Sequence, residues 1–260
     1  MSFAFPNIDP VILQIGSSPL KITWYSLSYV AGILLSWLYI RMLNKNKISN
    51  KIIDDLITYI IIGIIVGGRL GYVLFYDLEY NIAHPGNIIR TWDGGMSFHG
   101  GLFGVIAASF IFCKLNKLKF FDIMDLLACA TPIGLFFGRI SNFINAELYG
   151  RITDVSWGVI FPGQIHARHA SQLYESLTEG LLSFIILYLL ATKTKIRDIS
   201  GMISGIFLLL YALFRTLIEN YREPDEQIGF VIYNITMGQL LSTPMLLSGI
   251  IIIIYSMRAK

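Results

Sequence analysis

The sequence contains little charge for its length. Of its 260 residues only 14% are Asp, Glu, Lys or Arg, and 55% are hydrophobic. An average soluble domain has about 25% charged residues. A chain so poor in charge is typical of a membrane protein rather than of a soluble enzyme. The formal net charge is only +3 and no dense basic tract is present, so the sequence offers no surface for nucleic acid.

Cysteine is scarce as well. Cys113 and Cys129 lie inside or at the edge of apolar runs, and neither belongs to a CxxC or histidine-paired pattern. We therefore expect neither a disulfide nor a metal site, and interpret both as small buried side chains. The remaining histidines outside the apolar runs, His84, His166 and His169, lack the spacing of metal ligands.

Several segments that would divide or precede a domain are also missing. The sequence has no Pro- or Ser-rich linker, no low-complexity run and no obvious internal repeat. Its N-terminal segment lacks the basic region and the small-residue cleavage site of a signal peptide, so we expect the first apolar helix to be retained. These absences predict one integral-membrane domain over residues 1–260.

Long apolar runs dominate the rest of the chain. Spanning a bilayer takes about 20 mostly apolar residues, and a helix pairs all its backbone groups internally. The predicted fold class is all-α, a polytopic membrane protein with seven transmembrane helices. The predicted spans are residues 22–42, 54–77, 96–114, 123–145, 172–192, 201–221 and 235–256.

The basic residues between the spans predict the orientation, because the cytoplasmic side carries more Lys and Arg. The richer side receives Arg41, Lys45, Lys47, Lys51, Lys114, Lys117, Lys119, Lys193, Lys195, Arg197, Arg258 and Lys260. The poorer side receives Lys21, Arg90, Arg151, Arg168 and Arg222. The N-terminus is then outside and the C-terminus cytoplasmic. The loops at about 78–95, 146–171 and 222–234 are extracytoplasmic.

Three arginines lie inside these predicted spans. Arg69, Arg139 and Arg215 each fall late in a span that runs outward, and His99 opens a span that starts outside. An arginine at the centre of a membrane helix costs about 2.5–3.5 kcal/mol on insertion scales. We therefore predict that all four groups lie in the outer third of the membrane. Snorkelling of the arginines to the outer headgroups is the simpler alternative.

Polar neighbours favour a buried pocket over snorkelling. Asn142 lies one turn from Arg139, and Tyr211, Arg215 and Glu219 follow one another four residues apart on one helical face. Guanidinium groups bind phosphate with fixed charge and geometry, and a phospholipid headgroup is the nearest phosphate at that depth. A lipid-handling site is therefore favoured. An anion channel or transporter would use similar arginines, but it needs polar groups continuing to the inner side.

Glycines surround the histidine and recur in two helices. Gly63, Gly67 and Gly71 stand four residues apart, as do Gly134 and Gly138, and this spacing predicts close helix contacts. The glycines that flank His99, in the stretch WDGGMSFHGG at 92–101, allow either a close approach of the backbone to a ligand or simple turns. His99 itself is a candidate proton acceptor for a thiol or a hydroxyl.

Several motifs resemble those of the bacterial prolipoprotein diacylglyceryl transferases. GRISNFINAELYG (138–150) is similar to the signature of that family. GGRLGYVLFY (67–76), WDGGMSFHGG (92–101), SQLYE (171–175) and REPDEQIG (222–229) match in the same order. The resemblance extends from about Trp24 to Gly238. This chain departs from the family pattern at Ser141, Ala170 and Thr216, and none of the three removes a polar candidate residue.

The resemblance implies an enzyme of the bacterial inner membrane with its active site toward the periplasm. Such enzymes move the diacylglyceryl group of phosphatidylglycerol to the lipobox cysteine of a preprolipoprotein signal peptide and release glycerol phosphate. This is the first step of lipoprotein maturation. The nucleophile then belongs to the substrate, and neither a metal nor an organic cofactor is required.

The resemblance also assigns residues to the site. The implied catalytic residues are His99, Arg139, Arg215, Tyr25 and Glu219, with a general-base role for His99 as a hypothesis. The implied substrate-binding residues are Arg139, Asn142, Glu147, Gly150 and Tyr211, to which we add Arg69 from the preceding argument. Two other functions remain open: a phospholipid or anion transporter moves its substrate intact, and a passive lipid-binding protein releases nothing.

Overall fold

The structure, a computed structural model, describes residues 2–14, 16, 21–44, 47–224, 229–232 and 235–259. Residues 225–228 of the predicted REPDEQIG motif, and the basic residues Lys45 and Lys260, lie outside the described residues. The chain divides into two compact units. The first comprises Met1–Ile40 and Asp125–Lys260, and the second comprises Arg41–Met124. The one-domain expectation remains a prediction, and each unit is described by itself.

The helices agree with the predicted spans. Within the described part of the chain, six helical segments are long and apolar enough to cross a membrane, and a further apolar helix, α8, has 17 residues. The polytopic all-α prediction is therefore confirmed. The six are α1 (Trp24–Asn44), α2 (Asn50–Tyr76), α4 (Phe98–Asn116), α5 (Phe120–Ile144), the continuous segment Ser171–Lys193 and α9 (Met237–Arg258); α8 is Met202–Ile218.

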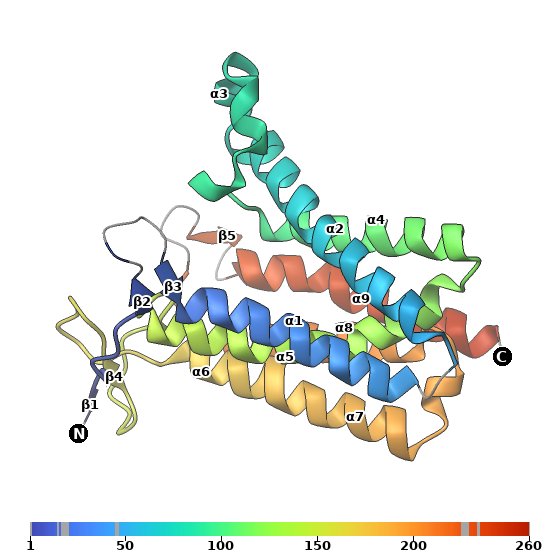
Figure 1. Cartoon of the computed structure of the whole chain (residues 1–260). Helices are drawn as coiled ribbons and strands as arrows, with labels where there is room; N and C mark the ends of the chain where they lie inside the picture. Colours follow the sequence, from blue (N-terminus) through green and yellow to red (C-terminus); the bar gives the residue numbers. More distant parts are fainter. Residues whose placement is uncertain are drawn as a thin grey trace. The chain divides into compact units, whose positions relative to one another are not determined.

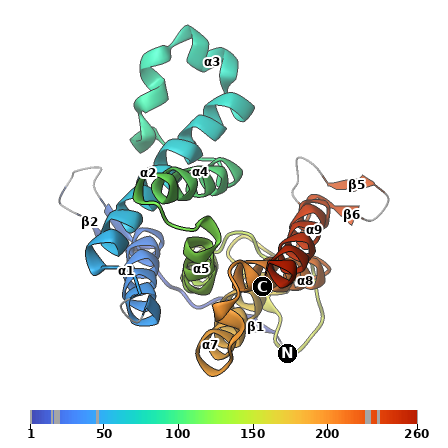
Figure 2. The ribbon, with the colours of Figure 1, turned by 90° about the vertical axis from the view of Figure 1, so that its right-hand side faces the viewer.

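In the first unit, the axes of α1, α5, α7, α8 and α9 are roughly parallel or antiparallel (Figure 1), and Figure 2 shows α1, α5 and α7 nearly end-on. The segment Ser171–Lys193 consists of α6 (Ser171–Glu175), a π-helical stretch η3 (Ser176–Leu182) and α7 (Ser183–Lys193). In η3, the Gly180 position lies so close to α5 that an added Cβ would be 2.7 Å from Phe136 Cα. The Ser176 hydroxyl also donates to the Phe136 carbonyl at 3.1 Å. These contacts fix the π-helical stretch against α5.

Short strands, which the sequence did not predict, accompany the first unit. They are β1 (Phe3–Ala4), β2 (Val11–Gln14), β3 (Lys21–Thr23), β4 (Val159–Ile160), β5 (Phe230–Ile232) and β6 (Ile235–Thr236). β1 pairs in parallel with β4, and next to this pair Phe5, Phe143 and Tyr149 pack against the buried Phe161. This small aromatic core covers the end of α5 and orders the long loop that follows it.

The second unit is built on the packing of α2 against α4. An added Cβ at Gly67 would lie 2.4 Å from the Gly100 carbonyl oxygen, and one at Gly63 would lie 2.6 Å from that of Gly104. The predicted role of Gly63, Gly67 and Gly71 in close helix contact is confirmed, and Gly100 proves to be one of their partners. Beyond α2, the chain forms α3 (Leu78–Ala83), η1 (Pro85–Ile89) and η2 (Thr91–Asp93) before α4 begins.

The prediction of a close helix contact was wrong for Gly138 in α5. An added Cβ at Gly134 or at Gly138 would meet no atom within 4 Å, although Gly134 Cα lies 3.3 Å from the Cβ position of Gly32 in α1. Gly138 therefore does not mediate a close helix contact, and it leaves open space directly before Arg139. The interpretation of Cys113 and Cys129 as buried small residues is confirmed, with 3% and 2% of their surfaces exposed.

Asp125 on α5 caps the start of α8. Its carboxylate accepts from the backbone N–H groups of Gly201 and Ser204, both at 2.8 Å, and from the Ser204 hydroxyl at 2.6 Å. The first N–H groups of a helix have no partner within the helix, and charged acceptors there are favourable. We expect Asp125→Ala to lower the free energy of unfolding by about 1–3 kcal/mol. Thermal unfolding in detergent measures this; a midpoint equal to that of the control Asp154→Ala, which changes an exposed acid, would contradict it.

Candidate functional site: a buried arginine–glutamate cluster

A network of charged side chains occupies the interior of the first unit. We define the charged cluster as Arg139, Glu175, Glu179, Arg215, Glu219 and Arg222. The residues come from α5, from the segment that begins with α6, and from α8 and the turn after it. Three guanidinium groups thus meet three carboxylates, and each of the three glutamates is at most 5% exposed. Charges this buried persist only when they are paired.

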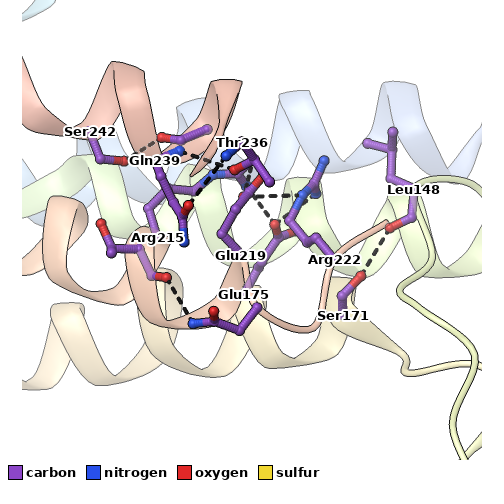
Figure 3. A network of polar contacts seen from close by, with 12 residues as sticks. Leu148, Ser171, Glu175, Arg215, Glu219, Arg222, Thr236, Gln239 and Ser242 are labelled. Atoms are coloured by element: carbon purple, nitrogen blue, oxygen red, sulfur yellow. Dashed lines mark hydrogen bonds and ion pairs between the residues drawn. The ribbon is translucent and has the colours of Figure 1, made fainter. Parts of the chain in front are cut away.

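Glu175 is the centre of the cluster. One of its oxygens, Oε1, accepts from Arg215 Nη1 at 2.6 Å and from Arg222 Nη1 at 2.8 Å. The other, Oε2, lies 3.2 Å from Arg139 Nε. Figure 3 shows Glu175, Arg215, Glu219 and Arg222 pointing toward one another. One carboxylate therefore fixes the positions of all three arginines, with α5 and α8 on either side of it.

Glu219 completes the opposite side of the cluster. Its Oε2 lies 3.0 Å from Arg215 Nη2 and 3.6 Å from Arg222 Nε. An added Cβ at Gly238 would be 2.6 Å from this carboxylate, so glycine is the residue that fits here. Gly238 lies in the first turn of α9, where the helix dipole favours a negative charge. A capping box of Thr236 and Gln239 fixes this end of α9.

The predicted binding residues after α5 form a second, connected group. Asn142 Nδ2 donates to Glu147 Oε1 at 2.7 Å, and Gln172 Nε2 donates to the backbone carbonyl of Glu147 at 2.6 Å. The Tyr25 hydroxyl interacts electrostatically with the charges of Arg139 and Glu147. It also lies 3.3 Å from the Tyr29 hydroxyl. The structure thus brings Tyr25, Asn142 and Glu147 to the side of Arg139. Tyr211, one turn before Arg215, interacts electrostatically with Glu179 and Arg139.

Gly150 links the long loop to the cluster. Its N–H donates to the His169 carbonyl at 2.8 Å, and it forms a β-bridge with Arg222. The His169 ring packs against both Tyr174 and Tyr221, and burial lowers the pKa of this imidazole, which favours its neutral form. An ordered loop therefore holds Arg222 in place from outside the bundle.

This packing predicts the effect of a small substitution. An added Cβ at Gly150 would lie 2.3 Å from the Tyr221 carbonyl oxygen and 2.9 Å from His169 Cβ. Overpacking of this kind costs about 1–3 kcal/mol. We expect Gly150→Ala to displace Arg222 from Glu175 and to reduce turnover at the charged cluster at least about tenfold. Gly86→Ala is the matched control, because an added Cβ there meets nothing within 4 Å. Equal turnover in the two variants would contradict this role of Gly150.

Two predicted site residues, Arg69 and His99, belong to the second unit. Arg69 is 8% exposed, and its guanidinium donates to the backbone carbonyls of Asn87, Ile88, Gly94 and Gly95. It therefore holds the segment between α3 and α4 in place. His99 lies exposed in the first turn of α4, with its ring edge-on to Phe98. Ser97 caps this helix by accepting from Gly100 N at 3.2 Å.

Sequence reasoning missed three members of the charged cluster as site residues. Glu175 was noted only within a motif, Arg222 only within a motif and among the basic residues that predict the orientation, and Glu179 was not noted at all. A signal was present, since Glu175 and Glu179 are acidic residues four apart inside an apolar span. Ionisable residues within a membrane span mark functional sites whatever their sign. The prediction of a site relied only on the arginines within the spans, Arg69, Arg139 and Arg215.

The fold and the charged cluster define an α-helical, multi-pass membrane protein with an ion-pair network inside its helix bundle. The sequence profile described as prolipoprotein diacylglyceryl transferase matches residues 10–255. The chain is also similar to proteins named phosphatidylglycerol–prolipoprotein diacylglyceryl transferase. That of Rickettsia akari is 54% identical over 249 residues, covering 94% of this chain and 95% of the relative. That of Rickettsia bellii is 53% identical over 255 residues, covering 96% of each. The chain belongs to the prolipoprotein diacylglyceryl transferase family.

Proposed function

We propose that this chain carries out its family's reaction at the charged cluster. In that reaction the diacylglyceryl group of phosphatidylglycerol moves to the lipobox cysteine thiol of a preprolipoprotein. A C–S bond forms at the glyceryl carbon that bears the phosphate ester, and the C–O bond to phosphate breaks. Glycerol phosphate leaves with the electron pair. The observation that supports this most directly is the burial of three arginines around one carboxylate, Glu175.

Arg139 is the proposed anchor of the lipid phosphate. Its side chain is 18% exposed, the most of the three arginines. Its nearest ion-pair distance, 3.2 Å, is longer than that of Arg215, 2.6 Å, or of Arg222, 2.8 Å. Gly138, the residue before Arg139 in α5, has open space around its Cβ position. A phosphate oxygen that reaches Arg139 would meet guanidinium N–H groups that are held only by ion pairs of 3.2 Å and 3.7 Å. Arg215 and Glu219, with Tyr211, form the wall behind it.

The neighbouring polar group is the proposed site of the glycerol end of the substrate. Asn142, Glu147 and Tyr25 offer amide, carboxylate and hydroxyl groups next to Arg139. The carboxylate accepts from hydroxyls, and the amide and the phenol hydroxyl can donate to them or accept from them, which suits a glycerol headgroup. Arginines already aimed at the departing phosphate would stabilise its developing charge without reorganising. The orientation that we propose places this site toward the periplasm of a bacterial inner membrane.

His99 is the proposed base that receives the thiol proton, with Gly94 to Gly101 as a flexible lip at the outer surface. Gly94 and Gly95 have φ of 89° and 75°, conformations that glycine adopts without strain. We expect His99→Gln to reduce turnover about a hundredfold, the range of general-base catalysis, and to lose the rise of rate with pH that an imidazole base produces. Identical pH–rate profiles for the variant and the wild type would contradict the base role. Arg69 is the proposed support of this lip, because its guanidinium donates to the backbone carbonyls of Gly94 and Gly95. Its predicted role in substrate binding would then be exerted through the position of the lip.

The direct test is a product analysis. Purified protein is incubated with phosphatidylglycerol and a peptide that carries a lipobox cysteine, and the peptide is examined by mass spectrometry. We expect a diacylglyceryl mass on the cysteine and one glycerol phosphate released for each modified peptide. A transporter would return phosphatidylglycerol intact, and a passive lipid-binding protein would bind it without glycerol phosphate appearing. Either of those outcomes would overturn the proposed function.

A further inference from the structure

The three glutamates of the charged cluster are not equally paired. Glu175 and Glu219 each have a carboxylate oxygen within 3.0 Å of a guanidinium nitrogen, and each interacts with at least two arginines. Glu179 has one ion pair in the described part of the chain, to Arg139 Nη2 at 3.7 Å, and neither of its oxygens has a hydrogen-bond partner there. A fully buried carboxylate with no hydrogen bond is costly. Glu179 is therefore the weakly held acid of the cluster.

The surroundings of Glu179 prevent it from turning to water. Its side chain has 0% exposure. It lies in the π-helical stretch η3, which the contacts of Ser176 and Gly180 with Phe136 hold against α5. π-Helical stretches are rare and frequently occur at functional sites. The charged and titratable groups that face Glu179 are Arg139 from α5, Tyr211 and Arg215 from α8, Arg222 from the turn after α8, and Glu175 on its own helix.

The charge of the cluster changes when a lipid binds. Empty, the cluster pairs three positive with three negative groups and is neutral overall. A phosphodiester monoanion at Arg139 would add an uncompensated negative charge in a buried site, where charge interactions are poorly screened. Glu179 and the phosphate would then compete for the same guanidinium. One proton on Glu179 removes both the excess charge and the competition.

We propose that Glu179 holds Arg139 while the site is empty, and takes up one proton from solvent when a phospholipid phosphate replaces it at that arginine. The proton binds a carboxylate oxygen, no other bond changes, and Glu179 is neutral while lipid is bound. Glu179 is thus a positioning residue, since it acts through Arg139. The proposal rests on the proposed role of Arg139 in binding phosphate.

The wild-type protein provides the first test. Binding of short-chain phosphatidylglycerol is measured by calorimetry in detergent, at one pH, in two buffers with different enthalpies of ionisation. The difference in heat counts the protons taken up for each lipid bound. We expect close to one proton for phosphatidylglycerol and close to none for a diacylglycerol of the same chain length, which lacks phosphate. Phosphatidylglycerol binding with no proton uptake would overturn the proposal.

Two variants provide the second test. Glu179→Gln removes the competing charge, so we expect its Kd for phosphatidylglycerol to be lower than that of wild type and independent of pH. In wild type, Kd should rise about tenfold for each unit of pH above the titration of Glu179, as linkage of one proton requires. Glu223→Gln makes the same chemical change at a half-exposed acid that pairs with Arg168, and it should behave as wild type. A pH-dependent Kd in Glu179→Gln would overturn the proposal.

Lipid binding by Arg139→Ala distinguishes a failure of this inference from a failure of the proposed function. If Arg139→Ala binds phosphatidylglycerol as tightly as wild type, the phosphate role of Arg139 is wrong, and with it the basis of both. If Arg139→Ala loses binding while wild type binds lipid without a proton, the proposed function stands and only the role of Glu179 falls.

Discussion

Arg139→Ala is expected to reduce turnover of phosphatidylglycerol by about a hundred- to a thousandfold. This is the range measured when a preorganised donor to a developing negative charge is removed. The substitution removes the proposed phosphate anchor and the arginine that forms the ion pair with Glu179. Both effects act on the phosphate rather than on the peptide. We therefore expect KM for phosphatidylglycerol to rise and kcat to fall, with little change in KM for the peptide.

The control for this prediction is an arginine outside the charged cluster. Arg41 pairs with Asp54 at 2.8 Å, and their side chains are 33% and 43% exposed. Exposed pairs of this kind contribute about 0–1 kcal/mol. Arg41→Ala should therefore keep nearly full turnover. Wild-type turnover in Arg139→Ala, or an equal loss in both variants, would contradict the role assigned to Arg139.

Glu175→Gln should have an effect of the same size for a different reason. The substitution neutralises the carboxylate that holds Arg139, Arg215 and Arg222 together. Breaking a buried ion pair by removing one partner costs about 3–5 kcal/mol. We expect a lower unfolding temperature and a loss of turnover of at least a hundredfold, because the three guanidinium groups then repel one another without their shared acceptor.

Comparison with Glu175→Asp separates stability from function. Aspartate keeps the charge and shortens the side chain by one methylene, so it should restore much of the unfolding temperature but little of the turnover. Turnover in Glu175→Gln that tracks its loss of folded protein, and no more, would show that Glu175 is only structural. Full turnover in Glu175→Gln would contradict its central place in the cluster.

The membrane helices could be predicted from the sequence because hydrophobicity alone determines them. A run of about 20 apolar residues has few alternatives to a membrane helix. The polar side of Arg139 was also predictable, since Asn142 follows it by one turn. The placement of Glu147 was not, because it depends on a loop whose path is set by Gly150, Gln172 and a small aromatic core. Such contacts join distant parts of the chain.

The errors have physical causes as well. Gly134 and Gly138 have the spacing of packing glycines, and Gly134 does lie close to Gly32, but spacing alone does not reveal that Gly138 faces open space. The substrate-binding role of Arg69 stays a prediction; its contacts with four backbone carbonyls of a nearby loop depend on the path of that loop and could not be predicted from the sequence. Glu175 and Glu179 were missed because glutamates in the first turns of an apolar span resemble ordinary surface residues, whereas Glu219 was predicted from its spacing to Arg215. Only the structure places Glu175 among three arginines.

The measurement that tests the central claim most directly is an experimental structure of the protein with phosphatidylglycerol bound. We predict a phosphate group with at least one oxygen at about 2.7–2.9 Å from a guanidinium nitrogen of Arg139, as charge-assisted hydrogen bonds require. The diacylglyceryl chains should leave along the open face of α5 at Gly138. A phosphate bound elsewhere, with all the ion pairs of Arg139, Glu175 and Glu179 intact, would contradict the account.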